Sequence, residues 1–157
     1  MIHKKNIKPL LIFIVSAFLI DQISKLLIVN TLTPFEPPRQ IISTLLRFKL
    51  IYNPSGVFGI SFGPDILYYI LSVIGIFVLF YISLMHHDKI GIIILGFIIG
   101  GALGNFVDRI RLNYVIDFVD MGIGNLRWFT YNFADAFITV GAVFLLGREV
   151  ITKKEKA

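Results

Sequence analysis

The sequence predicts an all-α integral membrane protein with four transmembrane helices, a small extracytoplasmic β element and an interfacial segment. Three observations predict this class. The 157 residues are 56% hydrophobic and only 16% charged, whereas soluble domains have about 45–50% apolar and about 25% charged residues. Four long apolar stretches approach the ~20 residues that cross a bilayer as a helix. Eight lysines and arginines lie at the chain ends and in the short turn 86–89, whereas six are spread over the two much longer connections, 30–65 and 108–130.

We expect one membrane domain over residues 1–157, with spans near 10–29, 66–85, 90–107 and 131–147. The second of these stretches carries no charge, and the fourth is the shortest. Because basic residues favour the cytoplasmic side, their distribution predicts that both termini are cytoplasmic. The first stretch has no small-residue cleavage pattern, so we interpret it as an uncleaved anchor.

The two long connections are therefore expected outside the membrane, and they differ in kind. Five of the six prolines lie in the insert 30–65, which excludes a long helix there. Residues 47–52 have strand-like composition and precede a turn at 53–56, so the insert is predicted to hold the β element. The connection 108–130 mixes charges with large apolar residues such as Trp128, and we expect it at the membrane interface.

The third apolar stretch carries glycines four residues apart, at Gly96, Gly100 and Gly104, with Gly101 beside them. Small residues on one face of a helix allow a second helix to approach closely in lipid. The pattern therefore predicts a tight helix contact along this stretch.

Polar side chains from four segments are predicted to meet at one depth, near the outer ends of the spans. They are Asp21, Lys25, Asn105, Asp108, Arg109, Asp117, Asp120, Asn132 and Asp135. An ionisable group inside a span costs roughly 2.5–3.5 kcal/mol, which makes each a functional candidate. Structural roles explain several of them: a charge pair for Asp21 and Lys25, and a solvated or capping position for Asp120. Asp135 is harder to explain, because no basic residue lies within a turn of it.

The residues alone leave two functions open. Two carboxyls close together share a proton and can activate water for attack on a peptide carbonyl, which favours an acid–base hydrolase. A small proton-coupled transporter would instead use Asp21, Lys25 and Asp135 as a relay. A scaffold without chemistry is a third interpretation. The absence of cysteine excludes thiol catalysis and cysteine-ligated metals, and we expect no metal, no cofactor and no nucleic-acid partner.

At these polar residues the chain resembles a known family, the bacterial lipoprotein signal peptidases (signal peptidase II). The matching blocks are Asp21-Gln22-Ile23-Ser24-Lys25, the run from Gly100-Gly101 through Gly104-Asn105 to Asp108-Arg109, Val115-Ile116-Asp117-Phe118, and Asn132-Phe133-Ala134-Asp135. A fifth block, Asn53-Pro54-Ser55-Gly56-Val57-Phe58, departs from the family pattern because its glycine comes one place late. We therefore expect the loop 53–58 to turn differently.

The resemblance implies a four-span aspartic endopeptidase of the bacterial cytoplasmic (inner) membrane, with its active site near the outer leaflet. It would remove signal peptides from diacylglyceryl-modified prolipoproteins, work as a monomer in contact with membrane lipid, and need no cofactor. The resemblance makes Asp117 and Asp135 the catalytic pair. Supporting or substrate-binding roles would fall to Asn105, Arg109, Asn132, Asp108, Asp21, Lys25, Asn53 and Gly101.

Overall fold

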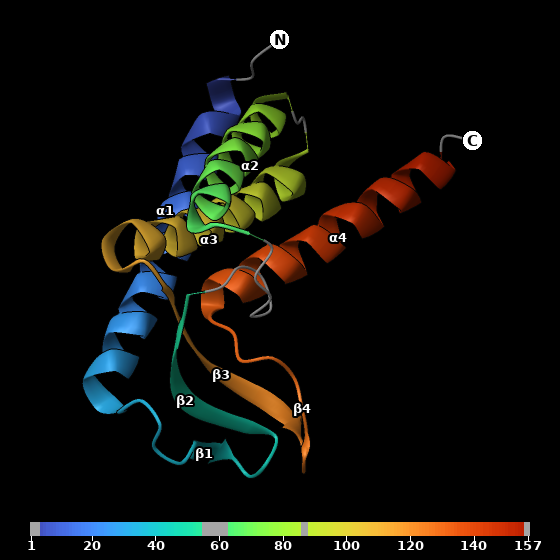
Figure 1. The fold of residues 1–157 in the computed structure, drawn as a ribbon. Helices are drawn as coiled ribbons and strands as arrows, with labels where there is room; N and C mark the ends of the chain where they lie inside the picture. Colours follow the sequence, from blue (N-terminus) through green and yellow to red (C-terminus); the bar gives the residue numbers. More distant parts are fainter. Residues whose placement is uncertain (1–3, 55–62, 86–87, 156–157) are drawn as a thin grey trace.

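The structure is a computed structural model, and it describes residues 4–54, 63–85 and 88–155. Four long helices form most of it (Figure 1). They are α1 (Lys4–Thr31), α2 (Asp65–Met85), α3 (Lys89–Leu112) and α4 (Phe133–Glu155). Within the described residues, α1, α2 and α3 are long and apolar enough to cross a membrane. The predicted fourth span coincides with most of α4, but α4 carries several charged residues, and its crossing of the membrane stays a prediction.

Helix α3 is longer than the span predicted for it, because it continues to Leu112. It ends where Asn113 adopts a left-handed conformation (φ 64°), and the backbone N–H of Asn113 donates to the carbonyl oxygen of Arg109. Asparagine tolerates this conformation better than most residues, so it serves as a stop signal. The extension keeps Asn105, Asp108 and Arg109 on one rigid helix.

Helix α3 packs against the other three helices, and its glycines make the closest contacts. A Cβ atom on Gly100 would collide with Ile14 and Ala17 of α1. One on Gly101 would lie 2.7 Å from the carbonyl oxygen of Ala134 in α4. The predicted tight contact is therefore confirmed, and it involves two partner helices rather than one.

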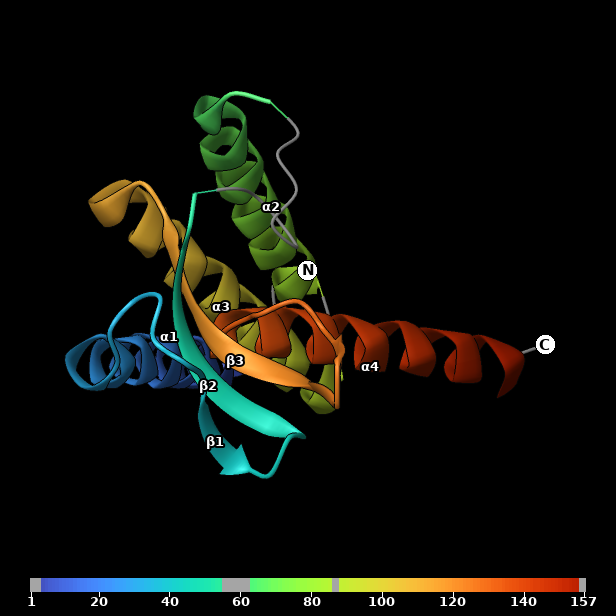
Figure 2. The same ribbon diagram turned by 60° about the horizontal axis from the view of Figure 1, so that its bottom comes forward.

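A four-stranded antiparallel sheet lies beyond one end of the helices (Figures 1 and 2). Its strands, in spatial order, are β1 (Arg39–Ile42), β2 (Leu46–Asn53), β3 (Val115–Ile123) and β4 (Leu126–Arg127). The predicted β element of the insert supplies β1 and β2. The other two strands come from the connection 108–130, which was expected only as an interfacial segment. They join at a turn in which Gly124 has a positive φ of 55°.

A hydrophobic cluster beneath the sheet fixes β3 against the helices. Phe118 is 1% exposed, and its ring meets Phe48 of β2 and Phe133 of α4 edge to face, with centroids 5.8 and 5.4 Å away. Ile116 belongs to the same cluster. Since successive side chains of a strand point to opposite faces, the packing of Ile116 and Phe118 in this cluster places Asp117 on the other face of β3.

Candidate active site

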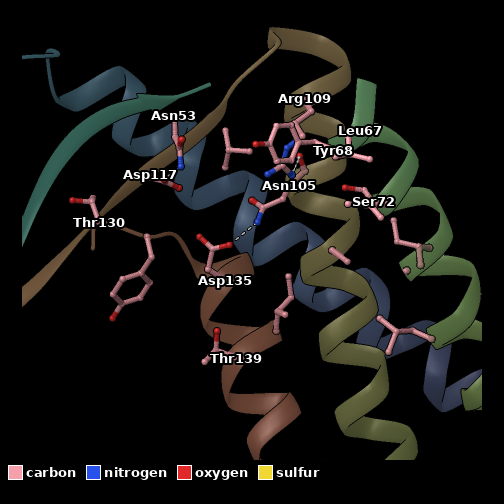
Figure 3. A pocket seen from close by; sticks show the side chains of 18 residues that line it. Asn53, Leu67, Tyr68, Ser72, Asn105, Arg109, Asp117, Thr130, Asp135 and Thr139 are labelled. Carbon is pink, nitrogen blue, oxygen red and sulfur yellow. Dashed lines mark hydrogen bonds between the residues drawn. The ribbon is translucent and has the colours of Figure 1, made fainter. Parts of the chain in front are cut away.

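Asp117 and Asp135 line one cavity of about 420 Å³ (Figure 3). The cavity lies between α2, α3 and the start of α4, next to the ends of β2 and β3. Its volume is typical of a small-ligand pocket. Asn53, Asn105 and Arg109 line it as well, so five residues that the sequence predicts for the site surround one space.

Asn132 joins the two acidic residues. Its Nδ2 donates to Oδ1 of Asp117 over 2.7 Å, and its Oδ1 accepts from the backbone N–H of Asp135 over 2.9 Å. The backbone N–H of Asn132 also donates to Oδ2 of Asp135, over 3.3 Å. This reciprocal pairing is a capping box at the first turn of α4. Local helix capping therefore fixes Asp135 relative to the residue that holds Asp117.

Each carboxyl has a second amide donor from another element. Nδ2 of Asn53, at the end of β2, donates to Oδ2 of Asp117 over 2.8 Å. Nδ2 of Asn105, on α3, donates to Oδ1 of Asp135 over 2.8 Å. Asn53 therefore reaches the site in spite of the shifted glycine that follows it in the sequence. Residues 55–58 of the loop lie outside the described residues, so the structure does not test whether the loop turns differently.

The environment of Asp117 favours its protonated form. The residue is 3% exposed. Burial, together with the negative charge of Asp135, raises the pKa of Asp117 to about 7, although hydrogen bonds from Asn53 and Asn132 act in the opposite direction. Two carboxyls placed close together can share one proton. Across the described residues, no cluster of three or more metal-binding side chains occurs.

Arg109 brings a positive charge to the cavity lining. Within residues 4–54, 63–85 and 88–155 its guanidinium forms no ion pair, and its Nη1 donates to the carbonyl oxygen of Asn105 over 3.3 Å. The hydroxyl of Tyr69 on α2 donates to the carbonyl oxygen of Arg109 over 2.7 Å. This contact anchors the end of α3, so the backbone that carries the guanidinium is held in place.

A buried ionic group lies behind the cavity. Lys25 is 2% exposed, and its Nζ lies 2.8 Å from both Asp21 and Asp108. Asp21 accepts a hydrogen bond from the backbone N–H of Ala134 over 3.0 Å, and Asp108 accepts one from Ile116 over 3.3 Å. The predicted pair of Asp21 and Lys25 is confirmed. The group also ties α1 and α3 to the start of α4 and to β3.

Gln22 is a site residue that the sequence interpretation left without a role. Its Nε2 donates to Oδ1 of Asp108 over 3.0 Å and to Oδ2 of Asp21 over 3.2 Å. It therefore completes the hydrogen bonding of both carboxylates. The available signal was an amide directly after Asp21 inside an apolar stretch.

The expectation that Asp120 is solvated or capping is wrong. Asp120 is 1% exposed and forms ion pairs with Arg47 of β2, over 2.6 Å, and with Arg127 of β4, over 2.9 Å. The register of the sheet places Arg47 directly opposite Asp120. Asp120 therefore links β2, β3 and β4 through ion pairs, and it does not line the cavity.

A second, largely apolar hollow of about 840 Å³ lies between the β3–β4 hairpin and α4. Leu126, Trp128 and Val140 are among the residues that line it. It shares three lining residues with the first cavity. They are Tyr131, Asp135 and Thr139. The two hollows thus adjoin at Asp135.

Comparison with known proteins finds similarity along most of the chain. The family described as signal peptidase (SPase) II matches residues 13–151. The lipoprotein signal peptidase of Coxiella burnetii (strain RSA 493 / Nine Mile phase I) is 37% identical, with 99% of each chain covered. That of Syntrophus aciditrophicus (strain SB) is 32% identical, covering 96% of this chain and 99% of the relative. A solved structure described as a bacterial membrane enzyme shares the fold, with a TM-score of 0.85 and 23% identity over 94% of this chain and 91% of the other.

Proposed function

The chain belongs to the signal peptidase II family, which removes signal peptides from lipoproteins, and we propose that it does so as an aspartic endopeptidase. Its substrates are prolipoproteins that carry a diacylglyceryl group, and it cleaves the bond before the lipidated cysteine. The observation that carries the proposal is the pair of Asp117 and Asp135, which line one cavity and are joined through Asn132.

The chemistry needs a water molecule between the two carboxyls and one proton on the pair. The ionised carboxylate takes a proton from the water while the water oxygen attacks the scissile carbonyl carbon. The protonated partner donates to the carbonyl oxygen, which gives a tetrahedral diol. Collapse of the diol breaks the C–N bond, and a carboxyl proton passes to the leaving amine. The two acids titrate as one unit, so the roles of acid and base belong to the pair.

The surrounding residues hold this pair and the substrate in place. Asn53 and Asn105 each donate to one carboxyl. Arg109, which has no acidic partner among the described residues, is placed to donate to a backbone carbonyl of the substrate. Gly101 lets the start of α4 approach α3. Asp21, Lys25 and Asp108 brace the helices and strand that carry the site.

The two hollows suit a substrate that has a large apolar group on each side of its scissile bond. A prolipoprotein has its signal helix on one side of the scissile bond and acyl chains on the other. We assign the signal helix to the cavity along α2, whose wall includes Leu67, Leu71 and Leu79, and the acyl chains to the hollow at Trp128. Both meet at Asp135, where the bond is cut.

The orientation that we propose places this site near the outer leaflet of the bacterial cytoplasmic membrane, with both termini in the cytoplasm. The first turn of α1 and the last turn of α4 lie at the side of the molecule away from the sheet, which supports this orientation (Figure 1). We propose that one copy of the chain suffices for activity, because both carboxyls and the side-chain amides of Asn53, Asn105 and Asn132 that donate to them come from a single chain.

The direct test incubates the purified chain in detergent with a diacylglyceryl-modified precursor and determines the product masses. The proposal predicts one cut, immediately before the lipidated cysteine. The same precursor without its lipid is the control and should be cleaved far more slowly. An intact lipidated precursor after incubation with folded protein would contradict the proposal.

A further inference from the structure

We propose that Lys25 is a positioning residue for the catalytic pair, because it sets the orientation of the Asn105 carboxamide that donates to Asp135. The inference rests on the proposed function and adds a role for a residue that does not line the cavity. Lys25 contacts neither acid of the pair through a hydrogen bond; its partners are Asp21, Asp108 and Asn105. Its charge acts on both acids through space, but its hydrogen-bonded route to Asp135 passes through Asn105.

The ammonium group leaves Asn105 no choice of orientation. A lysine ammonium has three N–H donors and no acceptor. At Lys25 these three donors meet Asp21 Oδ2 at 2.8 Å, Asp108 Oδ2 at 2.8 Å and Asn105 Oδ1 at 2.9 Å. The atom of Asn105 that faces Lys25 must accordingly be its oxygen. The Nδ2 on the other side of the carboxamide then points to Asp135 Oδ1, 2.8 Å away (Figure 3).

In the described part of the chain, Asn132 is the only other side chain that donates to Asn105 Oδ1, and it is a weaker constraint. Its Nδ2 lies 2.7 Å from Asp117 Oδ1, 3.1 Å from Asn105 Oδ1 and 3.3 Å from the carbonyl oxygen of Ile116. An amide nitrogen has two hydrogens for these three acceptors, and the shortest contact is with Asp117. The hydrogen from Lys25 is the one fully committed to Asn105.

The orientation matters for the chemistry at Asp135. A reversed carboxamide would place an oxygen against the carboxyl oxygen of Asp135 and remove its side-chain donor. A charged donor also polarises the amide that it binds, which strengthens the N–H on the far side. Lys25 is 2% exposed and Asn105 is 6% exposed, and Asp135 is partly buried. Solvent therefore does not readily supply a substitute donor.

The test needs a variant that lacks the ammonium without leaving an extra buried charge. Lys25→Met alone would leave Asp21 and Asp108 facing each other, so we combine it with Asp108→Asn, which restores the original net charge of the group. The matched control is Asp108→Asn alone. Each protein is purified in detergent, checked by its unfolding temperature, and assayed for kcat and KM with the lipidated precursor. The combined variant and its Asp108→Asn control are then both repeated in an Asn105→Leu background.

We expect kcat to fall about tenfold to a hundredfold relative to Asp108→Asn, as for loss of one hydrogen bond to a charged group, with KM nearly unchanged. In the Asn105→Leu background the same change should cost much less activity, because the carboxamide that links Lys25 to Asp135 is gone. The inference would be overturned if the loss of Lys25 lowered kcat by the same factor in both backgrounds. An unchanged kcat in the original background would overturn it as well.

If the charge-matched variant does not fold, Lys25→Arg provides the same test. It keeps the charge but moves the donors into a rigid planar fork, so a kcat loss that disappears in the Asn105→Leu background supports the inference, and a loss that persists there contradicts it. The unmodified chain is assayed alongside. Its failure to cleave would count against the proposed function itself, whereas cleavage by the unmodified chain with an unaffected Lys25 variant counts against this inference alone.

Discussion

Asn53 at the end of β2 donates a hydrogen bond of 2.8 Å to Asp117 in β3, although 64 residues separate them in the sequence. The contact exists because β2 and β3 pair in an antiparallel register that places Asn53 opposite Val115. It makes the sheet a part of the candidate active site rather than an appendage to the helices. It also gives Asn53 a direct influence on the ionisation of Asp117.

Replacing Asn53 by alanine should shift the pH dependence of cleavage. An N–H donor stabilises an ionised carboxylate, so Asn53 lowers the pKa of Asp117 and its removal raises that pKa. The active pair carries one proton, which it loses as the pH rises through about 7. The descending limb of a kcat/KM profile should therefore move to higher pH in Asn53→Ala, with about a tenfold lower maximum. A limb that stays in place or moves to lower pH would contradict this.

Gly101→Leu should lower activity strongly although it replaces neither acidic residue. A Cβ at Gly101 already meets the Ala134 carbonyl oxygen at 2.7 Å, and the backbone of α4 has to move away to accept a larger group. That movement separates Asp135 from Asn105, and we expect at least a tenfold loss of kcat. Gly147→Leu, at a position of α4 with open space around it, is the matched control. Equal activities of the two folded variants would show that this close approach is unimportant.

Asp120→Asn should lower stability more than activity. Asp120 is buried between Arg47 and Arg127, and neutralising it leaves two cations without their shared partner. Because both arginines are partly exposed, we expect a cost of about 2 kcal/mol. The comparison is Asp88→Asn in the exposed pair with Arg148, which should cost less than 1 kcal/mol. Unfolding in detergent measures both; a larger loss for Asp88→Asn would refute the ranking.

Val140→Trp should reduce the preference for long acyl chains. Val140 lines the hollow assigned to the lipid, and an indole there fills part of it. We expect kcat/KM to fall about tenfold for a long-chain diacylglyceryl precursor and much less for a short-chain one. Val143→Trp is the control, since Val143 is 66% exposed on the same helix and lines neither hollow. An equal effect on both precursors would contradict the assignment.

Local patterns in the sequence predict the helices and part of the site. Apolar length predicts α1, α2 and α3, and the spacing of the glycines predicts the close contacts of α3. The pair of Asp21 and Lys25 is four residues apart on one helix, so it is readable without a structure. These features depend on neighbours in the sequence, which is why they can be predicted.

The features that escaped prediction depend on partners far apart in the chain. Strand β3 is buried on both faces over its first six residues, so it lacks the alternation that identifies a half-buried strand. Asp120 looked solvated because Arg47 lies 73 residues away. The contact of Lys25 with Asp108 spans 83 residues and also requires the fold. Topology, rather than composition, brings these groups together.

The most direct test of the account compares Asp117→Asn and Asp135→Asn with the unmodified chain, each folded in detergent and mixed with the lipidated precursor. Asparagine has nearly the shape of aspartate but cannot carry the shared proton. The account predicts that each single change reduces cleavage at least a thousandfold, on the order expected for losing an essential catalytic acid or base, while the unfolding temperature stays within a few degrees. Turnover that persists in both variants at near the original rate would contradict a mechanism based on this pair.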